Sequence, residues 1–142
     1  MPLTSFTPNQ GFQDFSTLVY PTFTVTTYPD TATVTAADLL GGFILATKAG
    51  AATLTLPTAA LLNAAIPAAA VGRCFEFFVR NTGNNTYTMA VGTGGTSATG
   101  NTLTVATLST RTFLLRITGV VNGSDPTSTD SYTLYSTGVS LH

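Results

Sequence analysis

Hydrophobic and polar residues alternate along most of this chain with the two-residue period of β-strands. The clearest stretch is residues 72–81, and one face of the strand that it predicts is entirely apolar: Phe75, Phe77 and Val79. The other face mixes a thiol, an aromatic ring and two charges: Cys74, Glu76, Phe78 and Arg80. A solvated face rarely carries Phe, and a core face rarely carries Glu and Arg, so we expect the mixed face to meet another subunit.

Similar short strands precede and follow this stretch. They are predicted over residues 31–35, 43–47, 52–56, 86–91, 103–105, 110–118 and 131–136. Turns rich in Gly, Asn, Ser and Thr separate them, and a short helix over residues 59–65 begins after Thr58. Residues 36–42 predict a turn or one helical turn ended by glycine. The pattern predicts an all-β protein, a single antiparallel β-sandwich or jelly roll with one short helix.

Residues 110–118 form the natural partner of residues 72–81. Phe113, Leu115 and Ile117 make an apolar face, which we expect to pack with the apolar face of residues 72–81. If the two strands are neighbours, their opposite faces join into one predicted oligomer interface: Glu76, Phe78, Arg80, Leu114 and Arg116. Glu76 then pairs with Arg116 or with an arginine of another subunit. The alternative is that Phe78 and Leu114 lie beneath the N-terminal arm or a loop of the same chain.

Residues 1–30 predict an extended N-terminal arm, followed by the jelly-roll β-sandwich domain over residues 31–142. The arm is polar, punctuated by proline and without helical period, although residues 14–20 and 22–27 have the pattern of short strands. Isolated aromatic residues mark it as an anchoring segment: Phe6, Phe12, Phe15, Tyr20 and Phe23. Such an arm lies on the flank of its own domain or on a neighbouring subunit, with disorder as the remaining alternative.

The amino-acid composition argues against nucleic acid and membranes as partners. The 142 residues are enough for one domain, and only 8% of them are charged, against roughly 25% in an average globular domain. The net charge of −1 and the lack of a basic patch argue against a nucleic-acid partner. No apolar run approaches the ~18 residues of a transmembrane helix, so we expect no membrane partner.

No set of residues predicts catalysis or a bound metal or cofactor. The single histidine, His142, and the single cysteine, Cys74, lie far apart in the chain, and the acidic residues are scattered. Asp125 and Asp130 share a loop that suits a solvated turn better than a calcium site. The glycine-rich residues 92–95 lack the lysine of a phosphate-binding loop. We therefore expect a protein that is not an enzyme and binds no cofactor.

The order of these motifs resembles a known group. The motifs are GGFIL at residues 41–45, ATLTLPTA at residues 52–59, and Gly, Phe, Phe, Val and Asn at positions 72, 75, 77, 79 and 81. Over residues 31–137 the chain resembles the small jelly-roll surface proteins of phages and large viruses, which are trimeric capsid decoration (cement) proteins or fibre-head domains. The resemblance carries no catalytic signature and no receptor or capsid site.

The resemblance implies a function and partners. It implies a virion structural protein at the capsid exterior, which forms a homotrimer and binds the major capsid protein or another virion protein through its arm. The alternative is a fibre-tip or lectin-like module that binds a receptor or glycan through the loops at residues 92–100 and 123–130. An enzyme, such as a depolymerase fragment, is the third and weakest alternative.

Overall fold

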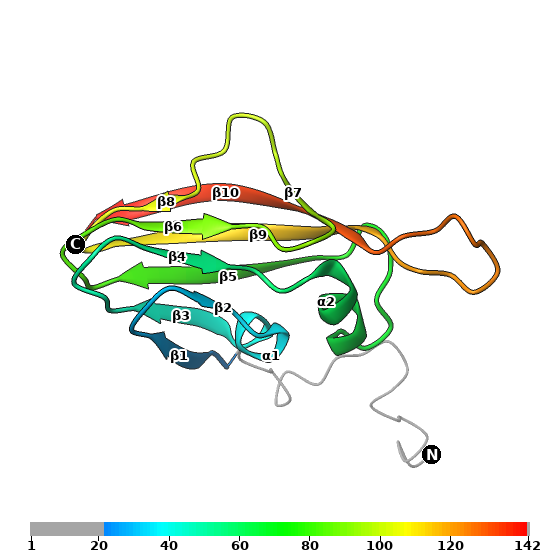
Figure 1. Cartoon of the computed structure of the whole chain (residues 1–142), viewed down its shortest axis with the longest axis horizontal. Coiled ribbons are helices and arrows are strands. Elements are labelled where there is room, and N and C mark those ends of the chain that lie inside the picture. The colour runs from blue at the N-terminus through cyan, green and yellow to red at the C-terminus, as the bar shows by residue number, and fades with distance from the viewer. Residues whose placement is uncertain (1–21, 142) are drawn as a thin grey trace, which may run out of the picture.

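The computed structural model describes residues 22–141 and shows an all-β protein with two sheets (Figure 1). The six-stranded sheet contains, in spatial order, β1 (Thr24–Tyr28), β3 (Gly42–Ala46), β5 (Cys74–Asn81), β9 (Ser109–Gly119), β10 (Ser131–Leu141) and β7 (Gly95–Ser97). The four-stranded sheet contains β2 (Ala32–Thr33), β4 (Ala52–Thr55), β6 (Tyr87–Ala90) and β8 (Thr104–Val105). Two short helices accompany them, α1 (Ala36–Leu40) and α2 (Ala59–Ala65).

The chain crosses from one sheet to the other after nearly every strand. From β1 to β8, odd-numbered strands join the six-stranded sheet and even-numbered strands join the four-stranded sheet. Among β1 to β6, two strands that are neighbours in a sheet are therefore separated in sequence by a strand of the other sheet, and they run in the same direction. Five of the eight strand pairs are parallel: β1–β3, β3–β5, β2–β4, β4–β6 and β7–β10. The prediction of antiparallel sheets is therefore wrong for these pairs.

The corner after β5 shows how one such crossing is held. The residues after Asn81, Thr-Gly-Asn-Asn, have the composition of a hairpin turn, but they lead the chain across to β6 in the other sheet. Asn81 is fully buried, and its side-chain amide donates to the carbonyl oxygens of Asn85 (2.7 Å) and Val105 (3.0 Å). Its Oδ1 accepts from the backbone N–H of Gly83 at 2.9 Å. A Cβ at Gly83 would lie 2.0 Å from the carbonyl oxygen of Lys48, so the corner requires glycine.

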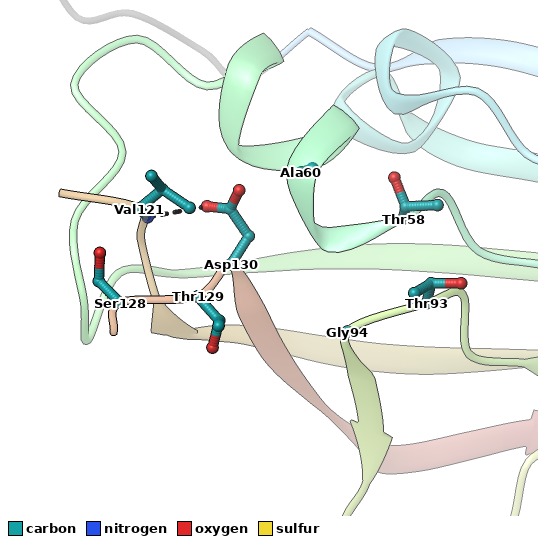
Figure 2. Close-up of a pocket in the computed structure, with 8 residues that line it drawn as sticks. All are labelled: Thr58, Ala60, Thr93, Gly94, Val121, Ser128, Thr129 and Asp130. Atoms are coloured by element: carbon teal, nitrogen blue, oxygen red, sulfur yellow. Dashed lines mark hydrogen bonds between the residues drawn. The ribbon is translucent and has the colours of Figure 1, made fainter. Parts of the chain in front are cut away.

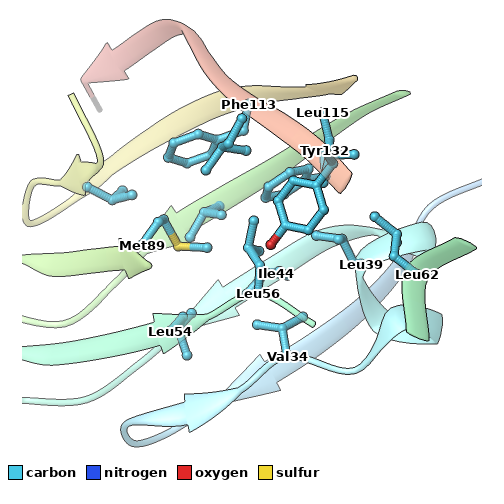
Figure 3. Close-up of a cluster of buried hydrophobic side chains, with 14 of the residues drawn as sticks. Val34, Leu39, Ile44, Leu54, Leu56, Leu62, Met89, Phe113, Leu115 and Tyr132 are labelled. Carbon is cyan, nitrogen blue, oxygen red and sulfur yellow. The ribbon is translucent and has the colours of Figure 1, made fainter. Parts of the chain in front are cut away.

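The two sheets share one hydrophobic core. The register of β5 and β9 pairs Phe77 with Phe113, whose rings stack with centroids 5.4 Å apart, and pairs Phe75 with Leu115. The predicted packing of these two strands is confirmed. Ile44 and Phe113 approach the core from one sheet, and Met89 approaches from the other (Figure 3). Replacing a fully buried Phe of this kind by Ala typically costs about 3–5 kcal/mol.

A carboxylate joins β1 to α1. Thr35 caps α1, and its hydroxyl accepts from the Asp38 N–H (3.1 Å) and donates to the Asp38 carboxylate (2.6 Å). The same carboxylate accepts from the hydroxyls of Tyr28 (2.8 Å) and Thr26 (3.0 Å) in β1. Hydrogen bonds donated by Thr35, Tyr28 and Thr26 hold the pKa of Asp38 below its ordinary value.

The structure contains the predicted helix and a second short one, and it places a strand at the end of the predicted arm. The helix at Ala59–Ala65 is confirmed, and the single turn predicted at residues 36–42 contains a second short helix, α1. The strand predicted at residues 22–27 appears as β1, and β1 pairs with β3 inside the sheet. The end of the expected arm therefore belongs to the folded sheet, and the rest of it lies outside the described residues.

Asp38→Asn should destabilise the protein at neutral pH by about 1 kcal/mol, because it removes the charge that accepts three hydroxyl hydrogen bonds at a half-exposed site. The depressed pKa means that this stabilisation is complete above the unfolded-state pKa of roughly 3.9 and is lost as the pH falls through the folded-state value. Urea unfolding at about pH 6 and about pH 2.5 should show the difference between variant and wild type shrinking in acid. An equal difference at both pH values would contradict this account.

Candidate functional site

The predicted interface residues share one face of the six-stranded sheet, the side of β5 and β9 that points away from the core. We call this side, together with the matching side of β3, the outer face, and its members include Phe43, Leu45, Glu76, Phe78, Arg80, Thr112, Leu114 and Arg116. Glu76 lies directly opposite Leu114, and Phe78 lies between Phe43 and Thr112. Phe78, Leu114 and Arg80 are half-buried in the single chain, whereas Glu76 and Arg116 are exposed.

The charged side chains of the outer face form no ion pair with each other. Arg116 is opposite Cys74 and therefore diagonal to Glu76, a separation of roughly 7–8 Å in β-sheets. Within the described residues the ion pair found is Lys48 with Asp30, at the far end of the sheet. Arg80 contacts the Thr110 hydroxyl at 3.5 Å. Glu76 and Arg116 thus remain available to groups outside the described chain.

Phe78 lies at the centre of a small aromatic cluster. The ring of Phe23 meets it edge-on with centroids 5.5 Å apart, and Phe43 stacks beside it at 6.3 Å. Phe23 reaches this position over Gly42, where a Cβ would lie 2.6 Å from the Phe23 ring. Phe23 itself is 50% exposed, so the segment leading into β1 covers Phe78 only in part.

This cluster bears on both interpretations of the outer face. Phe78 does lie partly under the last of the predicted arm residues, as the same-chain alternative supposes, while Leu114 lies directly opposite Tyr135 of β10. The other predicted anchoring residues of the arm lie outside the described residues: Phe6, Phe12, Phe15 and Tyr20.

Sequence reasoning missed Phe43 and Leu45 as members of the outer face. Residues 42–46 are all apolar or glycine, and the alternation of an uninterrupted apolar run does not reveal which positions face the core. The structure buries Gly42, Ile44 and Ala46 and leaves Phe43 and Leu45 half-exposed.

The two loops that the sequence singled out meet at a second place, an open hollow of about 440 Å³. Figure 2 shows its lining: Thr58 and Ala60 of the α2 end, Thr93 and Gly94 of one loop, and Val121, Ser128, Thr129 and Asp130 around the other. The Asp130 Oδ1 accepts from the Asn63 amide (2.7 Å) and the Val121 N–H (3.1 Å). These two bonds fix the carboxylate at the rim of the hollow.

Tyr132 anchors the glycine-rich loop beside this hollow. It is fully buried, and its hydroxyl accepts from the Gly92 N–H (2.9 Å) and donates to the Pro57 carbonyl oxygen (3.1 Å). Burial raises the pKa of the Tyr132 hydroxyl. A Cβ at Gly95 would lie 2.4 Å from the Tyr132 ring. Packing against this tyrosine thus explains a glycine of the loop that otherwise suggests phosphate binding.

Cys74 and the carboxylates are the other reactive or ligating side chains that the sequence singled out. Cys74 is exposed, and among the described residues no three His, Cys, Asp or Glu side chains gather as metal ligands. The Asp125 carboxylate accepts from the N–H and hydroxyl of Thr127, and these bonds lower its pKa. In residues 22–141 no helix has the length and hydropathy needed to cross a membrane.

No family model, curated protein or solved structure matches this chain. The geometry of the outer face and of the hollow is therefore the basis for a functional proposal.

Tyr132→Phe should lower the free energy of unfolding by about 1–3 kcal/mol, because the Gly92 N–H and the Pro57 carbonyl lose a buried partner. Tyr135→Phe is the matched control, since Tyr135 is half-exposed and lies on the opposite face of β10. Chemical denaturation of both variants measures the difference. Equal stability of the two variants would show that the Tyr132 hydroxyl does not anchor the loop.

Proposed function

We propose that this chain is a virion structural protein that decorates the outside of a capsid as a homotrimer. The observation that carries the proposal is the outer face, where half-buried apolar side chains adjoin charges without partners in the described chain. A solvent-facing sheet surface normally carries polar side chains at such positions, whereas the centre of a subunit interface is apolar with a few arginines.

The apolar part of the outer face is continuous across three strands. In register, Val25 of β1 neighbours Phe43 of β3, which neighbours Phe78 of β5. A standard interface buries roughly 800 Å² on each partner, and a row of this kind supplies its apolar centre. Glu76 and Arg116 of one copy then find opposite charges on another copy, which gives the contact its register.

The resemblance of the sequence motifs to small jelly-roll surface modules suggests this function, and the structure agrees with it in having two β-sheets around one core. This agreement does not extend to strand direction, because five of the eight strand pairs are parallel. The low charge and abundant hydroxyl side chains give a neutral surface of a kind that is common in virion-surface β proteins. Residues 1–21 supply the arm that reaches the major capsid protein or another virion protein.

A second candidate function is a fibre-tip or lectin-like module that binds a glycan. It is favoured by one observation, that both predicted loops line the same hollow beside the fixed Asp130 carboxylate. A glycan array probed with the wild type and with Thr93→Val tests it. Loop-dependent binding would favour this function, and the absence of any signal on glycans and host cells would exclude it.

Phe78→Glu should convert the trimer into monomers, because it places a charge in the centre of the apolar row. Leu114→Glu should do the same without disturbing the Phe23–Phe43 cluster. Thr88→Glu is the matched control, since Thr88 is exposed on β6 of the other sheet. Light scattering gives the mass, and circular dichroism checks the fold. Unchanged mass in both outer-face variants would refute the interface.

Removing residues 1–21 should leave a folded trimer that no longer binds capsids. The truncation must stop there, because β1 begins at Thr24 and pairs with β3. Sedimentation with purified particles that contain the protein measures occupancy. Full occupancy by the truncated protein would show that the arm is not needed for capsid binding. Absence of the full chain from purified particles would contradict the virion function itself.

A further inference from the structure

One sheet edge of the described chain is open and long enough to accept another strand. The two sheets have four edge strands, β1 and β7 in one and β2 and β8 in the other. Three of these have only two or three residues, and edge strands this short commonly prevent a sheet from pairing with another chain. β1 has five residues and borders the six-stranded sheet at the lower side of Figure 1.

The backbone of β1 presents free hydrogen-bonding groups at this edge. Its partner on the inner side is β3, where the Thr24 N–H donates to Gly41 (2.8 Å) and the Tyr28 carbonyl accepts from Thr47 (3.1 Å). Because alternate residues of a strand point their N–H and C=O groups in opposite directions, those of Val25 and Thr27 point to the free edge. Val25 is 58% exposed, and no charged residue protects the strand.

We propose that the free edge of β1 binds residues 14–20 of a second copy of this chain as an added strand. The proposal rests on the homo-oligomer proposed above and identifies where the arm of one subunit docks on its neighbour. The sequence of this segment, DFSTLVY, has strand character and one charge, and it is long enough to pair along all five residues of β1. Strand addition of this kind gains its affinity from main-chain hydrogen bonds.

The geometry next to β1 argues against docking of the segment on its own chain. Phe23 and Val25 lie on the same outer face, so the chain is already extended before β1 begins. A tight two-residue hairpin needs positive φ angles, which the ring of Pro21 forbids and which Phe23 does not have. A second copy can donate the segment without this tight turn.

The proposal also restricts the geometry of the oligomer. Only residues 21–23 join the donated strand to the β1 strand of its own copy, a span of about 10 Å when extended. The β1 edges of neighbouring copies must then lie close together around the symmetry axis. Phe23 leads directly into β1 and its ring reaches Phe78, so the added strand would adjoin the outer face.

Disulfide trapping between differently tagged, co-expressed full-length chains tests this placement. In a Cys74→Ser background, one chain carries Thr27→Cys and the other carries a single cysteine at one of positions 16 to 19. Mild oxidation should give a covalent heterodimer for at least one of these positions. Thr88→Cys in place of Thr27→Cys is the control and should give none, because Thr88 is exposed on the other sheet.

The outcomes separate this inference from the proposed oligomer. A third sample carries both cysteines on one chain, and a crosslink that forms there within single chains but never between the two differently tagged chains would overturn docking on a second copy. No crosslink in a protein that retains its trimeric mass would overturn strand addition and leave the oligomer intact. A monomer at all concentrations would overturn both. Val25→Pro adds a second readout, since it removes an N–H that points to the free edge and should abolish the crosslink without breaking a β1–β3 hydrogen bond.

Discussion

The rest of the structure depends on the pairing of β5 with both β9 and β3. On the inner side, this pairing stacks Phe77 on Phe113 and fixes the register of the core. Because side chains alternate strictly between faces, the same register determines what meets on the other side. Phe78 is thereby placed beside Phe43, and Glu76 beside Leu114. A slip of one residue would expose the core aromatics and bury the charges, so core packing and the outer face are specified together.

The sequence was sufficient wherever alternation mixed apolar with polar residues. The faces of β5 and β9, the helix at Ala59–Ala65 and the neighbourhood of the two strands followed from that pattern. Strand direction did not, because an alternating strand has the same pattern in a parallel as in an antiparallel pair. The turn after Asn81 has the residues of a hairpin, yet the chain there crosses to the other sheet. Hydrogen bonds of the buried Asn81 side chain hold this crossing. β3, apolar at nearly every position, gave no indication of its outer side.

The candidate site was predictable in part for the same reason. Its charged members, Glu76, Arg80 and Arg116, interrupt otherwise apolar strands, and the sequence therefore indicates a face that is neither a core face nor an ordinary solvated face. Its centre was not predictable, because the contact of Phe23 with Phe78 joins segments that are far apart in sequence. The hollow beside Tyr132 likewise arises only when two loops meet through the fold. The open edge of β1 follows from comparing strand lengths across both sheets, which requires the topology.

The central claim is that the outer face is buried between copies of this chain. Native mass spectrometry of the full-length protein at micromolar concentration tests it most directly. The account predicts a dominant species of three times the 14.6 kDa chain mass at this concentration. A single species of 14.6 kDa across the whole concentration range would contradict it.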